Sequence, residues 1–288
     1  MNEPRCRRRA RAVVGGFLAC RFATWLPVAE DLFGRTGTVP SAADNPFALP
    51  GVGPLLDAVF GVPIVVIALM MVLSLVHATG RWSRASALLL FVGMVLCFHR
   101  NQLTLNPSMP LLAFWLMSHA VMPPEPRHER RAGSDPDAAF WSRYRDVTWW
   151  VVGLAYTYSG LTKLASPSWR SGDAGLLILQ SPLGRDHALV GWLERAPTLV
   201  QAGTYAMLTV ELLMLPLALS RRARPYAFSA LVALHLSLLA TVNIADITLG
   251  MLAFHATQWP RRGGTRTPLD ALTASRARPE LPRHTPSR

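Results

Sequence analysis

Long apolar blocks separated by short arginine-rich segments dominate this sequence. Hydrophobic residues make up 51 % of the chain and charged residues 16 %, which is too apolar for an ordinary soluble protein. A helix needs about 20 apolar residues to cross a bilayer, and several blocks approach that length. Such blocks satisfy their backbone hydrogen bonds inside a bilayer only as helices. The sequence therefore predicts an all-α, polytopic membrane protein.

Eight apolar blocks predict helices, and they cover about residues 13–30, 62–78, 85–98, 109–122, 147–165, 198–219, 226–241 and 247–259. A Gly- and Pro-rich loop, 31–61, follows the first block, and a charged linker, 123–146, precedes the fifth. Glycine and proline break up the segment 166–197, so we expect an extramembrane or re-entrant excursion there. The bundle has eight spans, or six or seven if 109–122 or 247–259 does not cross.

The arginines fall mainly on one side of this predicted bundle. With the N-terminus inside, the cytoplasmic segments before the tail hold fifteen arginines and the opposite side holds five. This asymmetry follows the positive-inside rule and predicts two cytoplasmic termini. Residues 1–12 then form a basic cytoplasmic N-terminus, 13–259 the transmembrane domain, and 260–288 a basic cytoplasmic tail. The tail has little to bury, so we expect it to be disordered.

The first apolar block has a second interpretation as a cleaved signal peptide, because a basic segment precedes it. Arg21 interrupts its apolar core, however, and no clean small-residue cleavage site follows. These two observations favour an uncleaved first helix.

Charge and cysteine content exclude two other classes of protein. The net charge of +12 would suit a nucleic-acid-binding protein, but the arginines lie between membrane segments, so we expect no nucleic acid. The three cysteines, Cys6, Cys20 and Cys97, are too few and too dispersed for a disulfide framework or a metal site, so we expect no metal.

Lys163 is the only lysine in the chain, whereas the other 28 basic residues are all arginine. An ammonium can lose its proton when it is desolvated, but a guanidinium effectively cannot. Lys163 is therefore a candidate base. Because it lies within a turn of the outer end of its predicted helix, the alternative is a side chain that snorkels to the lipid headgroups.

The neighbours of Lys163 favour a protein-facing position. Tyr156, Ser159 and Gly160 lie seven, four and three residues earlier, on the same helix face. Small residues on that face indicate packing against protein rather than lipid. The loop that follows carries Trp169 and Arg170 and could fold back as a lid.

An ionisable residue inside an apolar block costs several kcal/mol unless it is paired or hydrated. Three more such residues are candidates: Arg21, Glu211 and His235. With a rise of about 1.5 Å per residue, the depths of Arg21 and Glu211 differ by roughly 6 Å. We therefore expect these two residues to form a buried ion pair, which either fixes helix register or belongs to a site. His235 is either a hydrogen-bonded core residue or a proton-transfer group.

The polar turn His99-Arg100-Asn101-Gln102 is predicted to lie on the same side of the membrane as Lys163. Asn101 and Gln102 can position a substrate by hydrogen bonds. Polar residues are also common in turns without any function.

The stretch Tyr158-Ser159-Gly160-Leu161-Thr162-Lys163-Leu164, with Trp169 six residues after the lysine, resembles the signature of the horizontally transferred transmembrane domain family. That family includes the vitamin K-dependent gamma-glutamyl carboxylase. Other elements occur in the family's order: Arg21, the turn His99-Arg100-Asn101, Asn106, Glu211 and His235. The resemblance covers about residues 13–259, and the motif around Lys163 is its most specific part.

The resemblance implies a catalytic role for Lys163, with His99 and Asn101, as the base that starts oxygenation of reduced vitamin K or another quinol. The strong base so formed removes a proton from a glutamyl γ-carbon, to which CO2 adds in a lyase-type step. The implied substrate and cofactor pocket contains Tyr156, Ser159, Gly160, Trp169, Arg170, Gln102 and His235. The carboxylase has a histidine directly after the asparagine of this turn, where this chain has Gln102.

The length of the chain fits the compact bacterial members of that family, which implies a bacterial inner-membrane protein. These members include compact proteins that resemble a membrane factor that helps a sporulation-delaying toxin to mature. The alternative function is therefore a non-catalytic membrane factor in the bilayer that helps a secreted peptide to mature or be exported. A transporter, the third class, predicts internal repeats or paired broken helices, and the sequence has no clear repeat.

Overall fold

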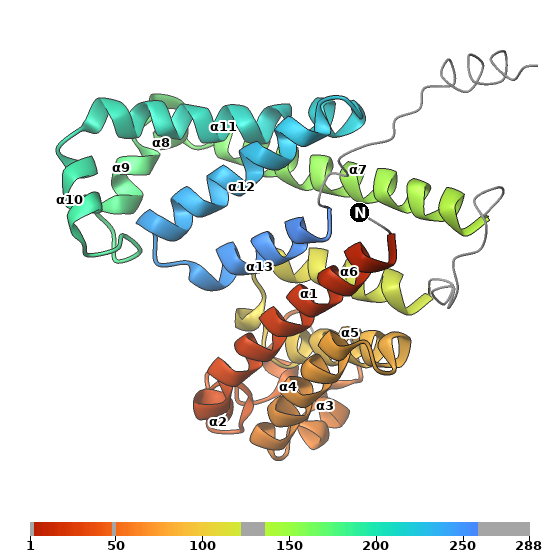
Figure 1. The fold of residues 1–288 in the computed structure, drawn as a ribbon. Helices are drawn as coiled ribbons and strands as arrows, with labels where there is room; N and C mark the ends of the chain where they lie inside the picture. Colours follow the sequence, from red (N-terminus) through yellow and green to blue (C-terminus); the bar gives the residue numbers. More distant parts are fainter. Residues whose placement is uncertain (1–2, 48–49, 122–135, 259–288) are drawn as a thin grey trace, which may run out of the picture.

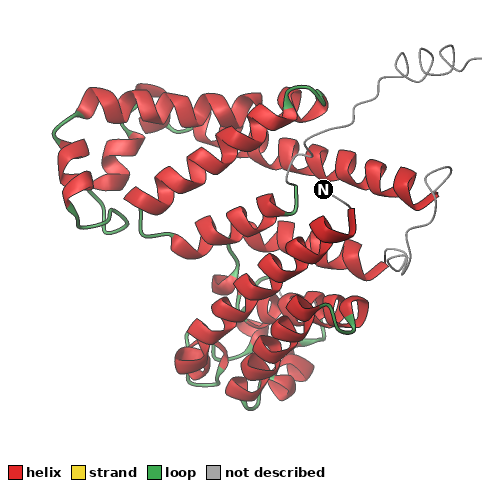
Figure 2. Ribbon diagram, in the orientation of Figure 1, coloured by secondary structure: helices red, strands yellow, loops and turns green. Residues whose placement is uncertain are grey.

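The computed structural model describes residues 3–47, 50–121 and 136–258, which form helices joined by turns and loops (Figure 1). The described part of the chain contains no strand; its one isolated β-bridge joins Gly184 to Val242 (Figure 2). The all-α prediction is therefore confirmed.

The eight longer helices fall where the apolar blocks predict them: α1 (Glu3–Trp25), α4 (Pro63–Thr79), α5 (Ser83–Arg100), α6 (Ser108–Val121), α7 (Pro136–Leu164), α11 (Pro197–Leu219), α12 (Arg224–Thr241) and α13 (Ala245–Ala256). The largest boundary difference is at α7, which begins at Pro136 and so continues into the charged linker. Proline suits a first helical position because the missing N–H has no partner there in any case. The predicted tail lies outside the described residues.

Short helices occupy the two long loops. The loop 31–61 contains part of α2 (Ala29–Phe33), the 3-10 turn η2 (Ala42–Asp44) and α3 (Gly53–Val59). The excursion 166–197 contains α8 (Pro167–Ser171), α9 (Ala174–Leu179) and α10 (Ala188–Glu194). Two further 3-10 turns, η1 (Leu26–Val28) and η3 (Gln102–Thr104), follow α1 and α5. Both loops are thus built from packed helical turns.

Within the described ranges, three helical segments are long and apolar enough to cross a membrane: Arg8–Phe33, α5 and α11. α3 and α4 add a fourth only as one span, and they are bent by 78° at their break. α6 and α13 are apolar but shorter. With about 1.5 Å of rise per residue, the 12 residues of α13 extend well short of a hydrocarbon core of about 30 Å. The count of eight spans stays a prediction.

The longer helices form two groups with α13 between them (Figure 1). α1, α4, α5 and α6 pack against one another in the lower part of the view, and α7, α11 and α12 pack in the upper part. α13 contacts α12 in one group and both α1 and α6 in the other. Side chains of α13 can therefore link the two groups.

The most extensive helix contact is between α7 and α11, and glycines allow the two backbones to approach closely. A Cβ added to Gly153 would lie 2.9 Å from the Ala218 Cβ and 3.0 Å from the Leu215 Cα. One added to Gly160 would lie 3.1 Å from Leu212. Small residues at such crossings are what packing between membrane helices requires. This contact brings the end of α7 against the middle of α11.

The charged start of the apolar part of α7 is tied to the turn between α11 and α12. Asp146 accepts hydrogen bonds from Arg221 and Arg224. Burial alone would raise the pKa of Asp146, but the hydrogen bonds from the two guanidinium groups hold that pKa below its ordinary value. The sequence predicts all three residues at the cytoplasmic side, and the structure brings them together.

Gly153→Ala tests the close contact between α7 and α11. We expect it to lower the free energy of unfolding by about 1–3 kcal/mol, because the added methyl overlaps Ala218 and the backbone of Leu215. Gly16→Ala is the matched control, since a Cβ there meets nothing within 4 Å. Alanine favours a helix over glycine by about 0.8–1.0 kcal/mol, so this control should gain stability. Thermal unfolding in detergent measures both changes, and a shift of the same sign in both variants would contradict the packing.

Candidate functional site

Lys163, near the end of α7, forms an ion pair and a hydrogen bond with Glu211 of α11. Its Nζ also lies 3.3 Å from the Ser159 Oγ, one turn earlier on α7. The Glu211 side chain is 6 % exposed, and that of Lys163 is 24 % exposed. Because Glu211 is paired with Lys163, the predicted pair between Arg21 and Glu211 is not formed. This part of the sequence interpretation is corrected.

Lys163 lies beside the middle of α11, and the first half of α11 continues past the end of α7. The short helices α8, α9 and α10 pack against this first half (Figure 1). The end of α7 is therefore flanked by protein. This arrangement argues against a lysine that simply snorkels to the headgroups.

Trp169 of α8 covers Lys163, with the Nζ 4.9 Å from the centroid of the indole ring. A cation over the face of tryptophan is attracted by the ring quadrupole. Tyr205 of α11 holds this loop by donating a hydrogen bond of 3.1 Å to the carbonyl of Arg170, whose side chain is exposed. Gly172 ends α8 with a φ of 84°, a conformation that favours glycine. The loop after α7 thus folds back over Lys163.

Trp169 also lines a pocket of about 300 Å³. The other lining residues come from α9, α10, the first half of α11 and the end of α12, and most of the lining is apolar. The few polar groups are hydroxyls, from Thr204, Ser237 and Thr241. Binding sites for small molecules are usually concave and mostly apolar, with a few polar groups. The volume of this pocket lies at the lower end of the usual range for such sites. Trp169 therefore contacts both the candidate base and a candidate binding pocket.

A buried polar cluster joins three helices next to this pair. The Tyr156 hydroxyl of α7 lies 2.6 Å from the His235 Nε2 of α12 and 2.9 Å from the His255 Nε2 of α13. All three side chains are buried. Glu211 is close enough to Tyr156, and Lys163 to His235, for electrostatic interaction. The structure therefore brings the predicted residues Tyr156 and His235 into the neighbourhood of Lys163.

Sequence reasoning missed His255, although a usable signal was present. His255 is an ionisable residue inside the apolar block 247–259, which is the same observation that singled out His235. Nothing in the spacing of the two histidines shows that they share one hydroxyl group, because they lie on different helices.

Arg21 of α1 pairs with Asp246, the second residue of α13. Its Nη2 also donates a hydrogen bond of 2.7 Å to the carbonyl of Thr104, and its guanidinium lies 4.5 Å from the Trp25 ring centroid. Asn106 donates a further hydrogen bond of 2.6 Å to Asp246. Asp246 lies one residue before the predicted apolar block 247–259, so it is not among the ionisable residues inside the blocks. A carboxylate also suits the first turn of a helix.

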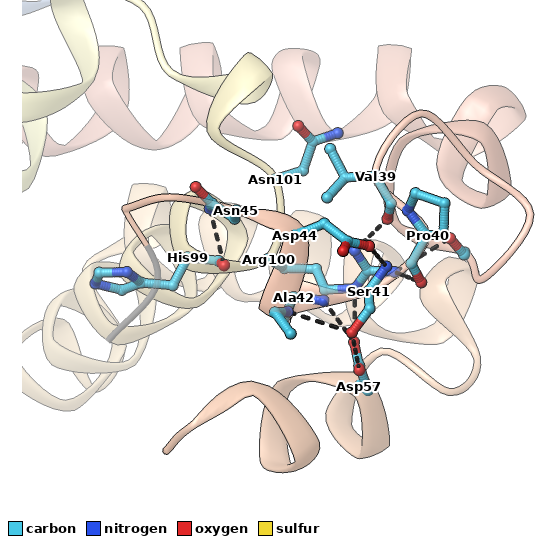
Figure 3. Close-up of polar contacts among 12 residues, drawn as sticks. Val39, Pro40, Ser41, Ala42, Asp44, Asn45, Asp57, His99, Arg100 and Asn101 are labelled. Carbon is cyan, nitrogen blue, oxygen red and sulfur yellow. Dashed lines mark hydrogen bonds and ion pairs between the residues drawn. The ribbon is translucent and has the colours of Figure 1, made fainter. Parts of the chain in front are cut away.

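The turn after α5 is a structural clamp on the loop 31–61 (Figure 3). Arg100 is 1 % exposed and donates hydrogen bonds to the carbonyls of Val39 (2.6 Å), Gly34 (3.1 Å) and Pro40 (3.2 Å). Its Nε lies 3.5 Å from the Asp57 Oδ1. A guanidinium has five donors in a rigid fork, so one side chain can hold several carbonyl groups at once.

The polar neighbours of Arg100 have the same role. Asn101 donates to the carbonyl of Leu32 at 2.7 Å, and the His99 Nδ1 lies 2.9 Å from the carbonyl of Phe47. Gln102 begins η3. His99 and Asn101 form hydrogen bonds with the loop 31–61 and within their own turn. Among the described residues, none of these hydrogen bonds reaches Lys163. The predicted support of Lys163 by these residues is therefore not found.

No protein-family model, curated protein or solved structure matches this chain. The family resemblance in the sequence stays a proposal. In the part of the chain that is described, no group of three or more His, Cys, Asp or Glu side chains lies close enough together to hold a metal ion.

Arg100→Lys tests the clamp. We expect a loss of about 2 kcal/mol or more in the free energy of unfolding, because one ammonium cannot replace a fork that binds three carbonyls. Arg35→Lys is the control, since Arg35 is exposed in the same loop. Thermal unfolding in detergent measures the change, and limited proteolysis within 31–61 should accelerate only in the Arg100 variant. Equal behaviour of the two variants would contradict the clamp.

A double-mutant cycle tests the pairing of Lys163. Glu211→Leu should lower the free energy of unfolding by about 3 kcal/mol or less, because it leaves a partly exposed ammonium without its partner. Adding Lys163→Met should recover most of that loss, giving a coupling of about 1 kcal/mol or more. The control cycle of Glu211→Leu with Arg21→Met should be additive. Coupling in the control cycle alone would restore the pairing predicted from the sequence.

Proposed function

We propose that this chain is a multi-pass protein of a bacterial inner membrane, with about eight spans and both termini in the cytoplasm, and that Lys163 is its catalytic base. Its substrate is an apolar, ring-shaped quinol such as reduced vitamin K or a related compound. One observation carries this proposal: the Trp169 ring contacts Lys163 and also lines a mostly apolar pocket of about 300 Å³. The apolar helices and the distribution of arginine support the location in a membrane.

Glu211 holds the Lys163 side chain through the ion pair. In this proposal Lys163 transfers its ammonium proton to the Glu211 carboxylate, and the neutral amine then accepts a proton from a substrate hydroxyl.

The pocket fits a quinol in size and in chemistry. Its apolar lining suits a hydrocarbon ring. The hydroxyls of Thr204, Ser237 and Thr241 donate to carbonyls of their own helices, and the hydroxyl oxygens can accept hydrogen bonds from the quinol hydroxyls. A bound quinol would supply the reducing electrons for oxygen-linked chemistry. The residues of this chain would orient the ring, exclude water and hold the proton at the Lys163 Nζ. A carboxylase-like step on a glutamyl peptide is supported by the sequence motif alone.

The groups that support the base differ from those implied by the family resemblance. His99 and Asn101 bind the loop 31–61, whereas Tyr156 and His235 interact electrostatically with Glu211 and Lys163, respectively. In this proposal the α7, α11 and α12 helices therefore hold the proton-handling groups.

Lys163→Arg tests the catalytic proposal, because it keeps the charge and removes a base that can lose its proton. The full chain in lipid nanodiscs, given a reduced naphthoquinone, is expected to consume oxygen above the uncatalysed rate. Lys163→Arg should lower that rate by about a hundredfold or more. Arg195→Lys, at an exposed position on the same side of the bundle, should leave it unchanged. No oxygen uptake by the wild-type chain would overturn the proposal.

The alternative is a non-catalytic factor that helps a secreted peptide to mature or be exported. It is favoured by the contacts of Lys163, whose Nζ is already engaged by Glu211, Ser159 and Trp169. An arginine can make the same contacts. Full recovery of peptide secretion by Lys163→Arg, in cells that lack the protein, would favour this alternative over the enzyme.

A further inference from the structure

The turn between α4 and α5 presents one large aromatic side chain to the outside of the protein. Trp82 is 82 % exposed, which makes it the most exposed large hydrophobic residue in the described part of the chain. Arg81 before it and Arg84 in the first turn of α5 are exposed as well. An indole has a large apolar surface, and contact with water over most of that surface is unfavourable unless a partner covers it.

The backbone of Trp82 is in a conformation that tryptophan rarely adopts. Its φ of 47° and ψ of 38° lie in the left-handed region, and no other non-glycine residue with a positive φ occurs among the described residues. A Cβ makes this conformation unfavourable, whereas glycine and asparagine adopt it more readily. The turn alone therefore does not account for a tryptophan. A strained residue at an exposed position indicates a function for its side chain.

The guanidinium groups on either side of Trp82 can bind a further group. Arg81 has no side-chain hydrogen bond or ion pair among the described residues. The Arg84 Nε donates a hydrogen bond of 3.0 Å to the carbonyl of Ala120, and neither Nη atom has a partner in the described ranges. The sequence has no Asp or Glu from residue 58 to residue 124, so α4, α5 and α6 bring no negative charge to this turn. A phosphate group complements such a surface.

An exposed apolar surface begins next to this turn on both helices. Val72 and Leu75 of α4 and Leu88 and Leu89 of α5 are between 45 % and 55 % exposed. With a rise of about 1.5 Å per residue, this surface begins within about 11 Å of Trp82 along the helix axes. Tryptophan favours the boundary between hydrocarbon and water, because its ring is apolar and its N–H is polar. Trp82 lies at such a boundary, between a charged tip and an apolar surface.

We propose that the turn 81–84 is a binding surface for an anionic phospholipid of the cytoplasmic leaflet. The two arginines bind the phosphate, and the indole lies among the glycerol and upper acyl groups. With the N-terminus in the cytoplasm, this turn is at the cytoplasmic surface, where anionic lipids attract arginine. The proposal rests on the membrane location given under the proposed function and not on the role of Lys163.

The turn between α11 and α12 lies at the same predicted surface and differs in one respect. Tyr226 is 77 % exposed there and follows Arg221, Arg222 and Arg224. Two of these arginines pair with Asp146, which neutralises part of their charge. The first phospholipid to bind is therefore expected at the turn between α4 and α5.

Binding of phosphatidylglycerol to the full chain in a nonionic detergent, followed by native mass spectrometry, tests this surface without any substrate. The first phosphatidylglycerol should bind more tightly than phosphatidylcholine, and Arg81→Gln should weaken its binding about fivefold. Arg195→Gln, at an exposed position on the opposite predicted side, is the matched control and should leave it unchanged. Equal binding of the two lipids, or an equal effect of the two variants, would overturn the proposal. Stronger competition by inorganic phosphate than by sodium chloride of equal ionic strength would identify a soluble anion as the occupant and reject the lipid.

Trp82→Gly separates the strain of the turn from its binding. Because glycine adopts a positive φ freely, this variant should melt about 2 °C or more higher in lipid-free detergent. It should also bind phosphatidylglycerol about fivefold or more weakly, because the apolar contact of the indole is lost. Trp82→Asn, which also tolerates a positive φ, takes its place if the glycine variant does not fold. Unchanged lipid binding would overturn the proposal whatever the melting temperature. Neither measurement involves oxygen uptake, so a failure of Lys163 as a base leaves these results unaffected.

Discussion

A charged side chain inside an apolar helix bundle needs a partner, because an unpaired charge there costs several kcal/mol. In this protein the partner of Lys163 is Glu211 of α11, which lies 48 residues later in the chain. The contact is possible because Gly153 and Gly160 bring α7 and α11 close together. The candidate site depends on this ion pair, because the pair holds Lys163, the only lysine in the chain, beside α11.

α13 joins the two helix groups through polar contacts in its first and last turns. Asp246 binds Arg21 of α1, and His255 binds Tyr156 of α7. Polar links of this kind specify one arrangement of helices, because a shifted helix would leave each group without its partner. A short, apolar helix therefore connects the two groups through polar contacts at both of its ends. Its length matters less than the positions of these two side chains.

The excursion between α7 and α11 gives Lys163 its surroundings. α8, α9 and α10 pack on the first half of α11 and enclose an apolar pocket with the end of α12. Trp169 contacts the ammonium group and also lines that pocket. The packing of these short helices therefore places protein around the end of α7.

The amino-acid sequence by itself determined the helical class, the positions of the eight longer helices and the choice of Lys163 as the central residue. These follow from local properties, namely apolar blocks, the arginines between them and the chemistry of one side chain. The tertiary structure alone decided the partners: Glu211 with Lys163 rather than with Arg21, Asp246 with Arg21, and His255 with Tyr156. It also assigned Arg100 and Asn101 to a clamp on the loop 31–61. Depth along a helix is readable from residue numbers, but which helices are neighbours and which faces meet depends on packing between segments up to 225 residues apart.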